Sequence, residues 1–378
     1  MSSNEYISIL GRQPELGLVE LESLLGAEAV QPFGRQAVLT TSELPIDRLG
    51  GVLKTARVLS RGPVVPLREL PIDASKLPLR DSKTPFGLSL YGLRETPKSL
   101  MAAGLELKKR LRERGSVRLV QPGKGLALSA AELRHNRVVE TGFEVLVLVA
   151  AGEMVVALTT GVQDIDWYSK RDYERPARSA KVGMLPPKLA QVLVNTTTAG
   201  SAVYDPFCGT GVVLQEALLM ERRAQGSDLS EDMVKASHVN LDWLQSQVPV
   251  PLPDWSVTSG DARQVKLPSG MAIVSEGYLG PNLSRSPSPA ELKKIQAELL
   301  PLYRESLASW AKQLEAGAEV SLCVPVWQDT KGWRYLGLVD ELADLGYTLK
   351  GFKHVRTPLL YARDDQTVGR QLLLLRKN

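Results

Sequence analysis

The stretch that most constrains this chain is the seven-residue sequence DPFCGTG, which runs from Asp205 to Gly211. A short apolar run, residues 202–204, precedes it, and apolar residues at helical spacing follow it from Val212 to Leu219. A strand, a glycine-containing turn and a helix in that order open the nucleotide-binding α/β domains. Because glycine lets the backbone approach a ligand closely, we expect a ligand at this turn. A purely structural tight turn is the alternative.

The residues of the turn favour one type of nucleotide ligand. The turn is led by a carboxylate and lacks the glycine with which a dinucleotide fold begins its fingerprint. A carboxylate suits a cationic, hydroxyl-bearing ligand better than a pyrophosphate. S-adenosylmethionine carries an ammonium, a sulfonium and a ribose, and we predict it as the cofactor. The residues predicted to contact it here are Asp205, Phe207, Cys208, Gly209 and Gly211.

Two more acids follow at the ends of the next two predicted strands. Asp228 lies about twenty residues after the turn, where a carboxylate grips the ribose diol in nucleotide-binding folds. A helix N-cap is the alternative role for this residue. Asp261 closes the third strand, where it could accept a hydrogen bond from the adenine amino group. Leu229 and Ala262 directly follow these acids and are assigned to the same site.

The fourth predicted strand ends in the sequence SEGYLGP, which contains Glu276 and Tyr278. An amino-group methyltransferase places here an acid or amide that holds the target nitrogen, followed by an aromatic ring that stacks on the base. Methyl transfer to an exocyclic amine needs in-line positioning and a proton acceptor. We therefore predict Glu276 and Tyr278 as the catalytic residues. Core packing is the alternative role for Tyr278.

The length of 378 residues predicts two or three domains. Residues 1–60 have the pattern of a small α+β unit, in which residues 46–58 are predicted to be helical. Residues 61–165 form a second compact unit and residues 166–190 a linker. In residues 191–378 strands and helices alternate, which indicates a mostly parallel sheet covered on both faces. The predicted fold class is therefore α/β, preceded by α+β units.

The net charge of +4 comes from an excess of basic residues in residues 1–190. A basic cluster at the end of one predicted helix contributes to this excess. We interpret the cluster as a phosphate-binding surface, and a solvated helix end is the alternative. The two cysteines lie far apart in sequence, which predicts no metal site and a reducing cytoplasmic location. The lack of a long apolar run predicts no membrane span. The residues predicted to bind RNA are Lys108, Lys109, Arg110, Arg112, Arg114 and Arg118.

The chain resembles the THUMP-containing tRNA guanine-N2 methyltransferases. The resemblance rests on DPFCGTG, on the preceding RP…GMLPPKLA…LVN and on the following Asp228 and Asp261. Residues 1–60, with ILGRQPELGLVELESLLG, are similar to the ferredoxin-like domain of that family, and residues 61–165 to its THUMP domain. The tail LLYARDDQTVGRQLLLL is similar to its closing strand pair. The resemblance implies a Rossmann-like methyltransferase domain at 191–378, tRNA as the partner and methylation of a guanosine amino group. We expect a monomer and leave open the need for a partner protein.

One motif departs from the family. The family has Asp-Pro-Pro-Tyr-Gly or a close variant where this chain has Glu276-Gly277-Tyr278-Leu279-Gly280. Loss of both prolines is expected to loosen the turn that presents the acid to the amine. This departure from the family motif has three explanations: the loop is rebuilt around the same chemistry, the target differs, or activity has been lost. The competing functions are N6-adenine methylation of DNA and RNA binding without methyl transfer. The modified nucleotide and the number of methyl groups stay open.

Overall fold

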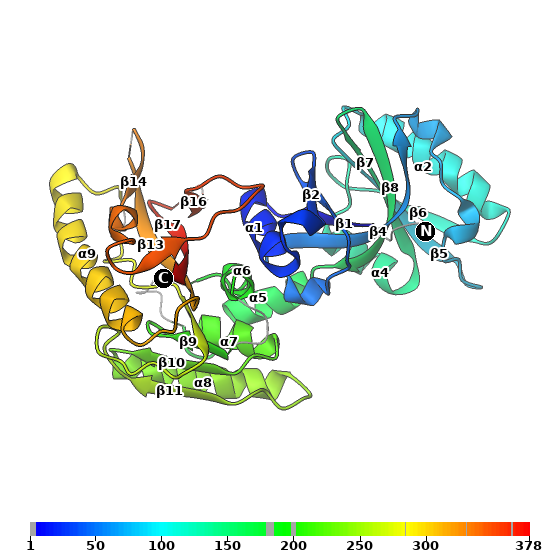
Figure 1. Ribbon diagram of the computed structural model, residues 1–378. Helices are drawn as coiled ribbons and strands as arrows, with labels where there is room; N and C mark the ends of the chain where they lie inside the picture. Colours follow the sequence, from blue (N-terminus) through cyan, green and yellow to red (C-terminus); the bar gives the residue numbers. More distant parts are fainter. Residues whose placement is uncertain (1–4, 179–184, 198–201, 284, 330, 364–365) are drawn as a thin grey trace. The chain divides into compact units, whose positions relative to one another are not determined.

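The computed structural model describes residues 5–178, 185–197, 202–283, 285–329, 331–363 and 366–378. The chain forms two compact units, residues 1–167 and residues 168–378. Each unit contains one sheet with helices packed against it (Figure 1). No helix in the described ranges is both long and apolar enough to cross a bilayer.

The first unit is built on an eight-stranded sheet in the order β2-β3-β1-β4-β8-β7-β5-β6. Strand β5 runs parallel to β6 and β7, and the other pairs are antiparallel. The strands are β1 Tyr6–Leu10, β2 Val30–Phe33, β3 Ala37–Thr40, β4 Val52–Pro63, β5 Thr84–Tyr91, β6 Val117–Val120, β7 Phe143–Ala150 and β8 Glu153–Val162. The helices are α1 Pro14–Leu25, α2 Pro97–Arg112, α3 Ala130–His135 and α4 Val138–Thr141, with short 3-10 turns at 27–29, 46–48, 67–69 and 74–76.

The structure corrects the helix predicted for residues 46–58. Only a short 3-10 turn at 46–48 forms, and β4 begins at Val52. The two glycines between them determine this outcome, because the Glu20 carboxylate accepts the N–H groups of Gly50 and Gly51 at 2.8 Å each. A Cβ at Gly51 would lie 2.6 Å from the Gly17 Cα, so the backbones pack too closely for a side chain.

The boundary predicted between residues 60 and 61 falls inside β4, so the structure places the domain division elsewhere. Strand β4 pairs with β1 of the first predicted domain and with β8 of the second. A buried polar contact joins the same two segments: the Lys54 ammonium donates to the Glu144 carboxylate at 2.6 Å. Ser89 and Thr159 donate to the two oxygens of the same carboxylate. Residues 5–167 therefore share one sheet and one buried hydrogen-bond network.

The second unit is built on a nine-stranded sheet in the order β11-β10-β9-β12-β13-β17-β15, with β14 paired to β13 and β16 to β17. Strands β9 to β13 run parallel to one another, and β14 and β17 run antiparallel to β13. The strands are β9 Ala202–Asp205, β10 Ala224–Asp228, β11 Trp255–Ser259, β12 Met271–Ser275, β13 Glu319–Asp329, β14 Gly332–Tyr335, β15 Tyr347–Leu349, β16 Leu359–Tyr361 and β17 Val368–Lys377. The helices are α5 Ile165–Tyr173, which begins in the first unit, α6 Pro187–Asn195, α7 Val212–Leu219, α8 Glu231–Gln247 and α9 Pro289–Ala311, with a 3-10 turn at 338–341.

Helices cover both faces of this sheet. Successive side chains of β13 point alternately to the two faces and show what packs on each. Val320, Leu322 and Val324 belong to one buried cluster with the apolar stripe of α9. Ser321 points to the opposite face, where its hydroxyl meets that of Thr196 at the end of α6 (2.9 Å). The predicted mostly parallel sheet with helices on both faces is therefore confirmed. The α9 stripe consists of Ile295, Leu299, Tyr303, Leu307 and Trp310.

The predicted linker, residues 166–190, is only partly a connector. Helix α5 occupies its start and α6 begins at Pro187. The Arg171 guanidinium of α5 forms a buried ion pair with Glu216 of α7, with Nε 2.7 Å from Oε1. This contact attaches α5 to the second unit. Residues 183–184 of the GMLPPKLA motif lie outside the described ranges.

We expect loss of the Glu144 carboxylate to destabilise the first unit strongly. A Glu144→Leu substitution leaves the buried Lys54 ammonium without its counterion, and breaking a buried pair costs about 3–5 kcal/mol. Glu153→Leu is the matched control, because the Glu153–Arg61 pair is about one-third exposed and its loss should cost far less. Urea denaturation followed by far-ultraviolet circular dichroism measures both. Equal losses of unfolding free energy in the two variants would contradict the prediction that the buried Lys54–Glu144 pair is the more costly to break.

Candidate active site

The site lies where the strand order of the second sheet reverses. From β9 the chain proceeds outward to β10 and β11, and β12 then pairs with β9 on its other side. Open α/β sheets bind ligands at the carboxyl ends of the strands next to such a reversal. Asp205 ends β9 and Ser275 ends β12. The Ser275 hydroxyl donates to Asp205 Oδ1 at 2.6 Å, and so joins the two strand ends.

Burial dominates the electrostatics of Asp205. Its side chain is 2% exposed, and this burial raises the pKa of the carboxyl group to about 7. Hydrogen bonds from the Ser275 hydroxyl and the Phe207 N–H oppose that rise, while the charges of Asp228 and Glu276 add to it. Asp205 thus changes charge near neutral pH. A cationic ligand group at this carboxylate would favour the ionised form.

The turn after Asp205 has left-handed backbone at both predicted glycines, with φ of 52° at Gly209 and 82° at Gly211. A Cβ at Gly211 would lie 3.0 Å from the Ser237 hydroxyl, which donates to the Gly209 carbonyl at 2.8 Å. The Cys208 side chain is 4% exposed, and burial raises the pKa of its thiol well above the usual value. Cys208 therefore contributes to packing as a neutral thiol.

Phe207 is only partly buried, and its ring packs on Tyr303 and Trp310 of α9. Its backbone N–H donates to Asp205 Oδ1 at 3.0 Å. The side chain therefore anchors the turn to the sheet face that α9 covers. The contact of Phe207 with a cofactor stays a prediction.

Asp228 holds the turn as well as lying in the predicted ribose position. Its two carboxylate oxygens accept the N–H groups of Gly209 and Ser230, each at 2.9 Å. Ser230 is the N-cap residue of α8, so the alternative role of Asp228 as a helix N-cap is wrong, and Asp228 holds the loop that precedes the helix. Leu229 beside it is 72% exposed. An exposed apolar side chain at this edge is suited to packing against an adenine ring.

Asp261 follows the outer strand β11 and forms an ion pair with Arg263, with Nη2 2.6 Å from Oδ2. The hydrogen bonds from Arg263 hold the pKa of this carboxyl below its usual value. The N–H of Gly260 bonds to the Asp228 carbonyl at 3.0 Å, so this loop adjoins β10. Ala262 is buried, and its carbonyl accepts from the Trp310 indole N–H at 2.8 Å. The structure therefore brings all three predicted acids to one sheet edge.

The divergent loop after β12 is held by specific contacts. Glu276 Oε1 accepts from Arg370 Nε at 2.5 Å. Gly277 has a φ of 56°, and a Cβ there would lie 2.5 Å from the Tyr303 hydroxyl and 2.8 Å from the Cys323 carbonyl. The Tyr303 hydroxyl donates to the Tyr278 carbonyl at 2.8 Å. Neighbouring atoms therefore enclose this glycine, and the expectation that it loosens the turn stays a prediction.

Tyr278 is 48% exposed, so core packing does not account for it. Its main chain is held by Tyr303, and the chain then turns through Gly280, whose φ is 88°. An exposed ring next to Glu276 can stack on a base. Its role as a catalytic residue stays a prediction.

The segment before α6 also contacts the glycine turn. The Asn240 side chain of α8 is fully buried and donates to the carbonyls of Thr210 and Ala177 at 2.9 Å each. The Ala177 N–H donates back to Asn240 at 3.0 Å. The Arg175-Pro176 part of the predicted motif is thus adjacent to the turn it precedes in sequence.

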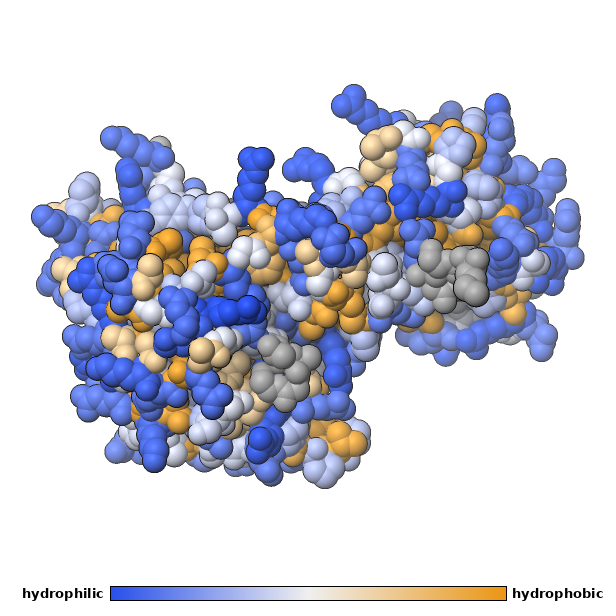
Figure 2. Space-filling view, in the orientation of Figure 1, coloured by the Kyte–Doolittle hydropathy of each residue, from blue (hydrophilic) through white to orange (hydrophobic). Residues whose placement is uncertain are grey.

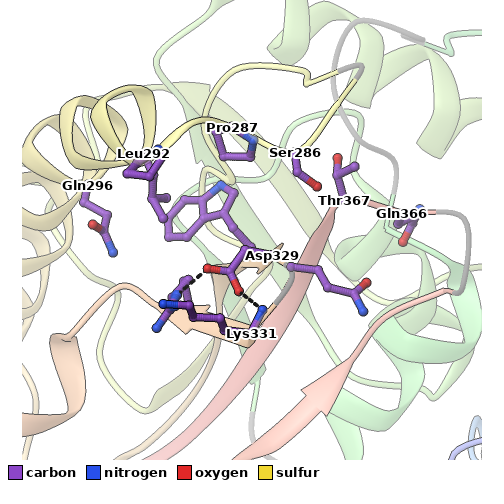
Figure 3. A pocket seen from close by; sticks show the side chains of 12 residues that line it. Ser286, Pro287, Leu292, Gln296, Asp329, Lys331, Gln366 and Thr367 are labelled. Atoms are coloured by element: carbon purple, nitrogen blue, oxygen red, sulfur yellow. Dashed lines mark hydrogen bonds and ion pairs between the residues drawn. The ribbon is translucent and has the colours of Figure 1, made fainter.

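A large open pocket of about 800 Å³ lies beyond β12 on the same unit. Figure 3 shows Pro287 and Leu292 near the start of α9, and Asp329 and Thr367 across the pocket from them. Asp329 forms an ion pair with Arg334 at 2.6 Å and accepts the Lys331 N–H at 2.7 Å. Thr367 precedes Arg370 by three residues, or about 10 Å of extended chain. The lining residues are Ser286, Pro287, Pro289, Leu292, Gln296, Trp327, Gln328, Asp329, Lys331, Arg334, Gln366 and Thr367.

The predicted RNA-binding residues lie in the first unit, on α2, in the turn that follows it and on β6, and they differ in exposure. Arg110 is half-buried and donates to the carbonyls of Leu70 and Ile72, which favours a structural role. Arg118 is exposed and donates to Asn136 at 3.0 Å. Lys108 is half-buried, and Lys109, Arg112 and Arg114 are exposed. The face of the molecule in Figure 2 is mostly hydrophilic, with hydrophobic residues scattered between.

Sequence reasoning missed three residues of the site: Ser275, Tyr303 and Arg370. A signal existed for Arg370, because a lone arginine precedes the apolar run LLLL in a predicted strand. Ser275 adjoins the predicted acid without a motif of its own. Tyr303 lies within an amphipathic helix, where a tyrosine indicates core packing. Only the tertiary structure brings these side chains to the loop.

The reversed strand order, the acid-led glycine turn and the carboxylates at successive strand ends define the second unit as a Rossmann-like methyltransferase domain. S-adenosylmethionine is the methyl donor of this class, which confirms the predicted cofactor. Residues 175–276 match the family described as UPF0020, RMKL-like, methyltransferase domain. The match begins at the segment held by Asn240 and ends at Glu276.

Two curated relatives are tRNA (guanine(10)-N2)-dimethyltransferases. The protein of Methanothermobacter thermautotrophicus is 33% identical over 162 residues, which is 42% of this chain and 42% of the relative. That of Pyrococcus abyssi is 37% identical over 97 residues, or 26% of each chain. The matched parts therefore span less than half the length of these relatives. The crystal structure of TrmN from Thermus thermophilus has a TM-score of 0.53 at 18% identity, over 99% of this chain and 100% of that one, and shows a shared fold.

We expect the affinity for S-adenosylmethionine to fall as the pH drops below about 7. Protonation of Asp205 removes the charge that would attract the ligand ammonium, and the loss approaches about tenfold for each further pH unit. Calorimetric titration between pH 5.5 and 8 measures the dissociation constant. Asp205→Asn should weaken binding and remove this dependence. Asp261→Asn is the control, since the pKa of Asp261 is already low and the slope should persist. A flat profile for the unmodified protein would contradict the role of Asp205.

Proposed function

We propose that this protein transfers a methyl group from S-adenosylmethionine to the exocyclic amine of a guanosine in tRNA. The observation that carries the proposal is Glu276, which stands at the end of β12 beside Asp205 with one oxygen held by an arginine. A carboxylate there can accept a hydrogen bond from an amino group and turn its lone pair toward a methyl donor. The names of the curated relatives support guanosine in tRNA as the acceptor.

In the proposed reaction, the chain's residues bind and orient the two reactants. Asp205, Asp228 and Asp261 face the cofactor, with the backbone at Gly209 and Gly211 close to it. Glu276 receives the amine proton, and the exposed ring of Tyr278 stacks on the base. Leu229 covers the adenine. A cytoplasmic location agrees with a tRNA substrate.

The sheet order supports an acceptor side opposite the cofactor side. Across the carboxyl edge the order is Asp228 on β10, Asp205 on β9, Glu276 after β12, and then the open pocket at the ends of β13 and β17. The cofactor acids lie on one side of Glu276 and the pocket on the other. An RNA strand that enters over this pocket would bring its base to Glu276 from the side away from the cofactor.

The composition of the pocket suits RNA. Lys331 and Arg334 supply positive charge for phosphates, and the amide side chains of Gln328 and Gln366 can pair with base edges. Pro287 and Leu292 supply apolar surface on which a base can rest. In the first unit, the exposed cations of α2 and β6 are proposed to hold tRNA backbone. We retain residues 61–165 as a THUMP-like RNA-binding segment within the larger sheet.

The proposal is tested with labelled S-adenosylmethionine and an unmodified tRNA transcript, followed by digestion to nucleosides. Label in N2-methylguanosine or its dimethyl form is expected, and the ratio of the two gives the number of methyl groups added. Label in N6-methyladenine of DNA would support the competing enzyme. Cofactor binding with no transfer to either nucleic acid would support a binding protein.

Glu276→Gln tests the catalytic assignment. The amide keeps the shape and can accept from Arg370, but it cannot take up the amine proton. We expect kcat to fall at least about 100-fold, while the dissociation constant of S-adenosylmethionine changes less than twofold. Glu298→Gln is the control, because Glu298 is an exposed acid of α9. Full activity of Glu276→Gln would show that another group accepts the proton.

The pocket is tested by a double substitution, Lys331→Gln with Arg334→Gln. We expect the KM for tRNA to rise about tenfold and the slope of its salt dependence to fall by about one to two, as each lost phosphate contact predicts. The affinity for S-adenosylmethionine should stay the same. Lys312→Gln, at an exposed lysine that follows α9, controls for a general loss of charge. An unchanged KM for tRNA would place the RNA elsewhere.

A further inference from the structure

A buried arginine from the far end of the chain reaches the predicted catalytic acid. Arg370 lies in β17, opposite Pro325 of β13 and Tyr361 of β16. Its side chain is 3% exposed, and its Nε donates to Glu276 Oε1 at 2.5 Å. The guanidinium carbon also lies 5.7 Å from the centre of the Tyr361 ring. Strand pairing and two side chains therefore fix the position of the guanidinium.

The carboxylate of Glu276 is only partly used by this contact. Within the described part of the chain, the hydrogen bond from Arg370 is made to Oε1 and none is made to Oε2. The Glu276 side chain is 15% exposed, whereas that of Arg370 is almost fully buried. The carboxylate thus has one side fixed by the protein and one side that a ligand can reach.

We propose that Arg370 is a positioning residue that holds the Glu276 carboxylate by one oxygen so that the other faces the acceptor amine. The inference rests on the proposed function and deepens it. In the transfer, the nitrogen–carbon bond forms as the carbon–sulfur bond breaks, and the sulfonium becomes a neutral thioether. The nitrogen then loses one proton to Glu276 Oε2, from which water removes it.

The same contact offers a physical replacement for the missing prolines. In the family the turn is stiffened by two ring residues, whereas here Glu276 is tied to β17 and Gly277 is enclosed by Tyr303 and Cys323. Glutamate is one methylene longer than aspartate and loses more rotamer freedom when it is ordered. A fixed guanidinium restricts that freedom. The loop is therefore rebuilt around the acid by tertiary contacts.

The groups that face Glu276 decide how its charge responds to pH. Burial raises the pKa of the Glu276 carboxyl group, and the adjacent Arg370 charge opposes that rise. Tyr303 of α9 and Cys323 of β13 also face it, but burial raises the pKa of both, so they stay neutral. Asp205 of β9 contributes a charge that depends on its own ionisation. Loss of Arg370 should therefore move the ionisation of Glu276 to higher pH.

The test compares Arg370→Gln, Arg370→Lys and the control Arg376→Gln, an exposed arginine of the same strand. For each, kcat and KM for a tRNA transcript are measured from pH 6 to 9.5, together with the dissociation constant of S-adenosylmethionine. For Arg370→Gln we expect kcat at neutral pH to fall at least about tenfold. The acidic limb of the kcat profile should move up by about one pH unit or more, so that activity recovers in alkali. Arg370→Lys should restore part of kcat, and cofactor affinity should change less than twofold.

A purely structural role predicts a different result. In that case kcat falls equally at every pH, without alkaline recovery and without rescue by lysine, and this outcome would overturn the proposal. If Arg370→Gln does not fold, Arg370→Lys decides, because lysine keeps the charge without the guanidinium geometry, and a large fall in its kcat that is equal at every pH would overturn the proposal. Wild-type protein that methylates tRNA while these variants behave normally would reject only the role of Arg370. Wild-type protein without any transfer would reject the proposed function as well.

Discussion

The hydrogen bond between the Ser275 hydroxyl and the buried Asp205 carboxyl is the contact on which the site depends. It joins β9 and β12 at the point where the strand order reverses, the point at which an open sheet leaves room for a ligand. Asp205 also accepts the Phe207 N–H, so the same carboxyl sets the start of the glycine turn. Cofactor side and acceptor side therefore share one buried acid. Its position between them explains why its ionisation depends on both Asp228 and Glu276.

Buried ion pairs recur wherever distant segments meet in this protein. Lys54 and Glu144 join two parts of the first sheet, and Arg171 and Glu216 attach α5 to α7. Such pairs give little net stability compared with apolar side chains, but they are costly to break. They thus favour one arrangement of the segments over others. The Arg370–Glu276 pair has the same form and differs in its partly open carboxylate, which is why a role beyond stability is inferred for it.

Much of the site could be predicted from the sequence because its motifs are local. The strand, turn and helix around residues 202–219 form as expected, and the glycines adopt the left-handed backbone that their positions require. The first sheet was harder to predict. Residues 46–58 have helical spacing, but Glu20 and the close approach of Gly17 and Gly51 determine the backbone there. Contacts between segments far apart in sequence override local propensity in such places.

By itself, the sequence determined the class of cofactor, because the residues predicted to hold it form one short turn and follow successive strand ends. It also determined the alternating pattern of the second sheet. The tertiary structure alone decided that residues 5–167 share a single sheet, because β4 pairs on both of its edges. The tertiary structure alone also decided which contacts hold the divergent loop at residues 276–280. Gly277 is enclosed there by the Tyr303 hydroxyl and the Cys323 carbonyl, and strand pairing brings Arg370 to the side of Glu276.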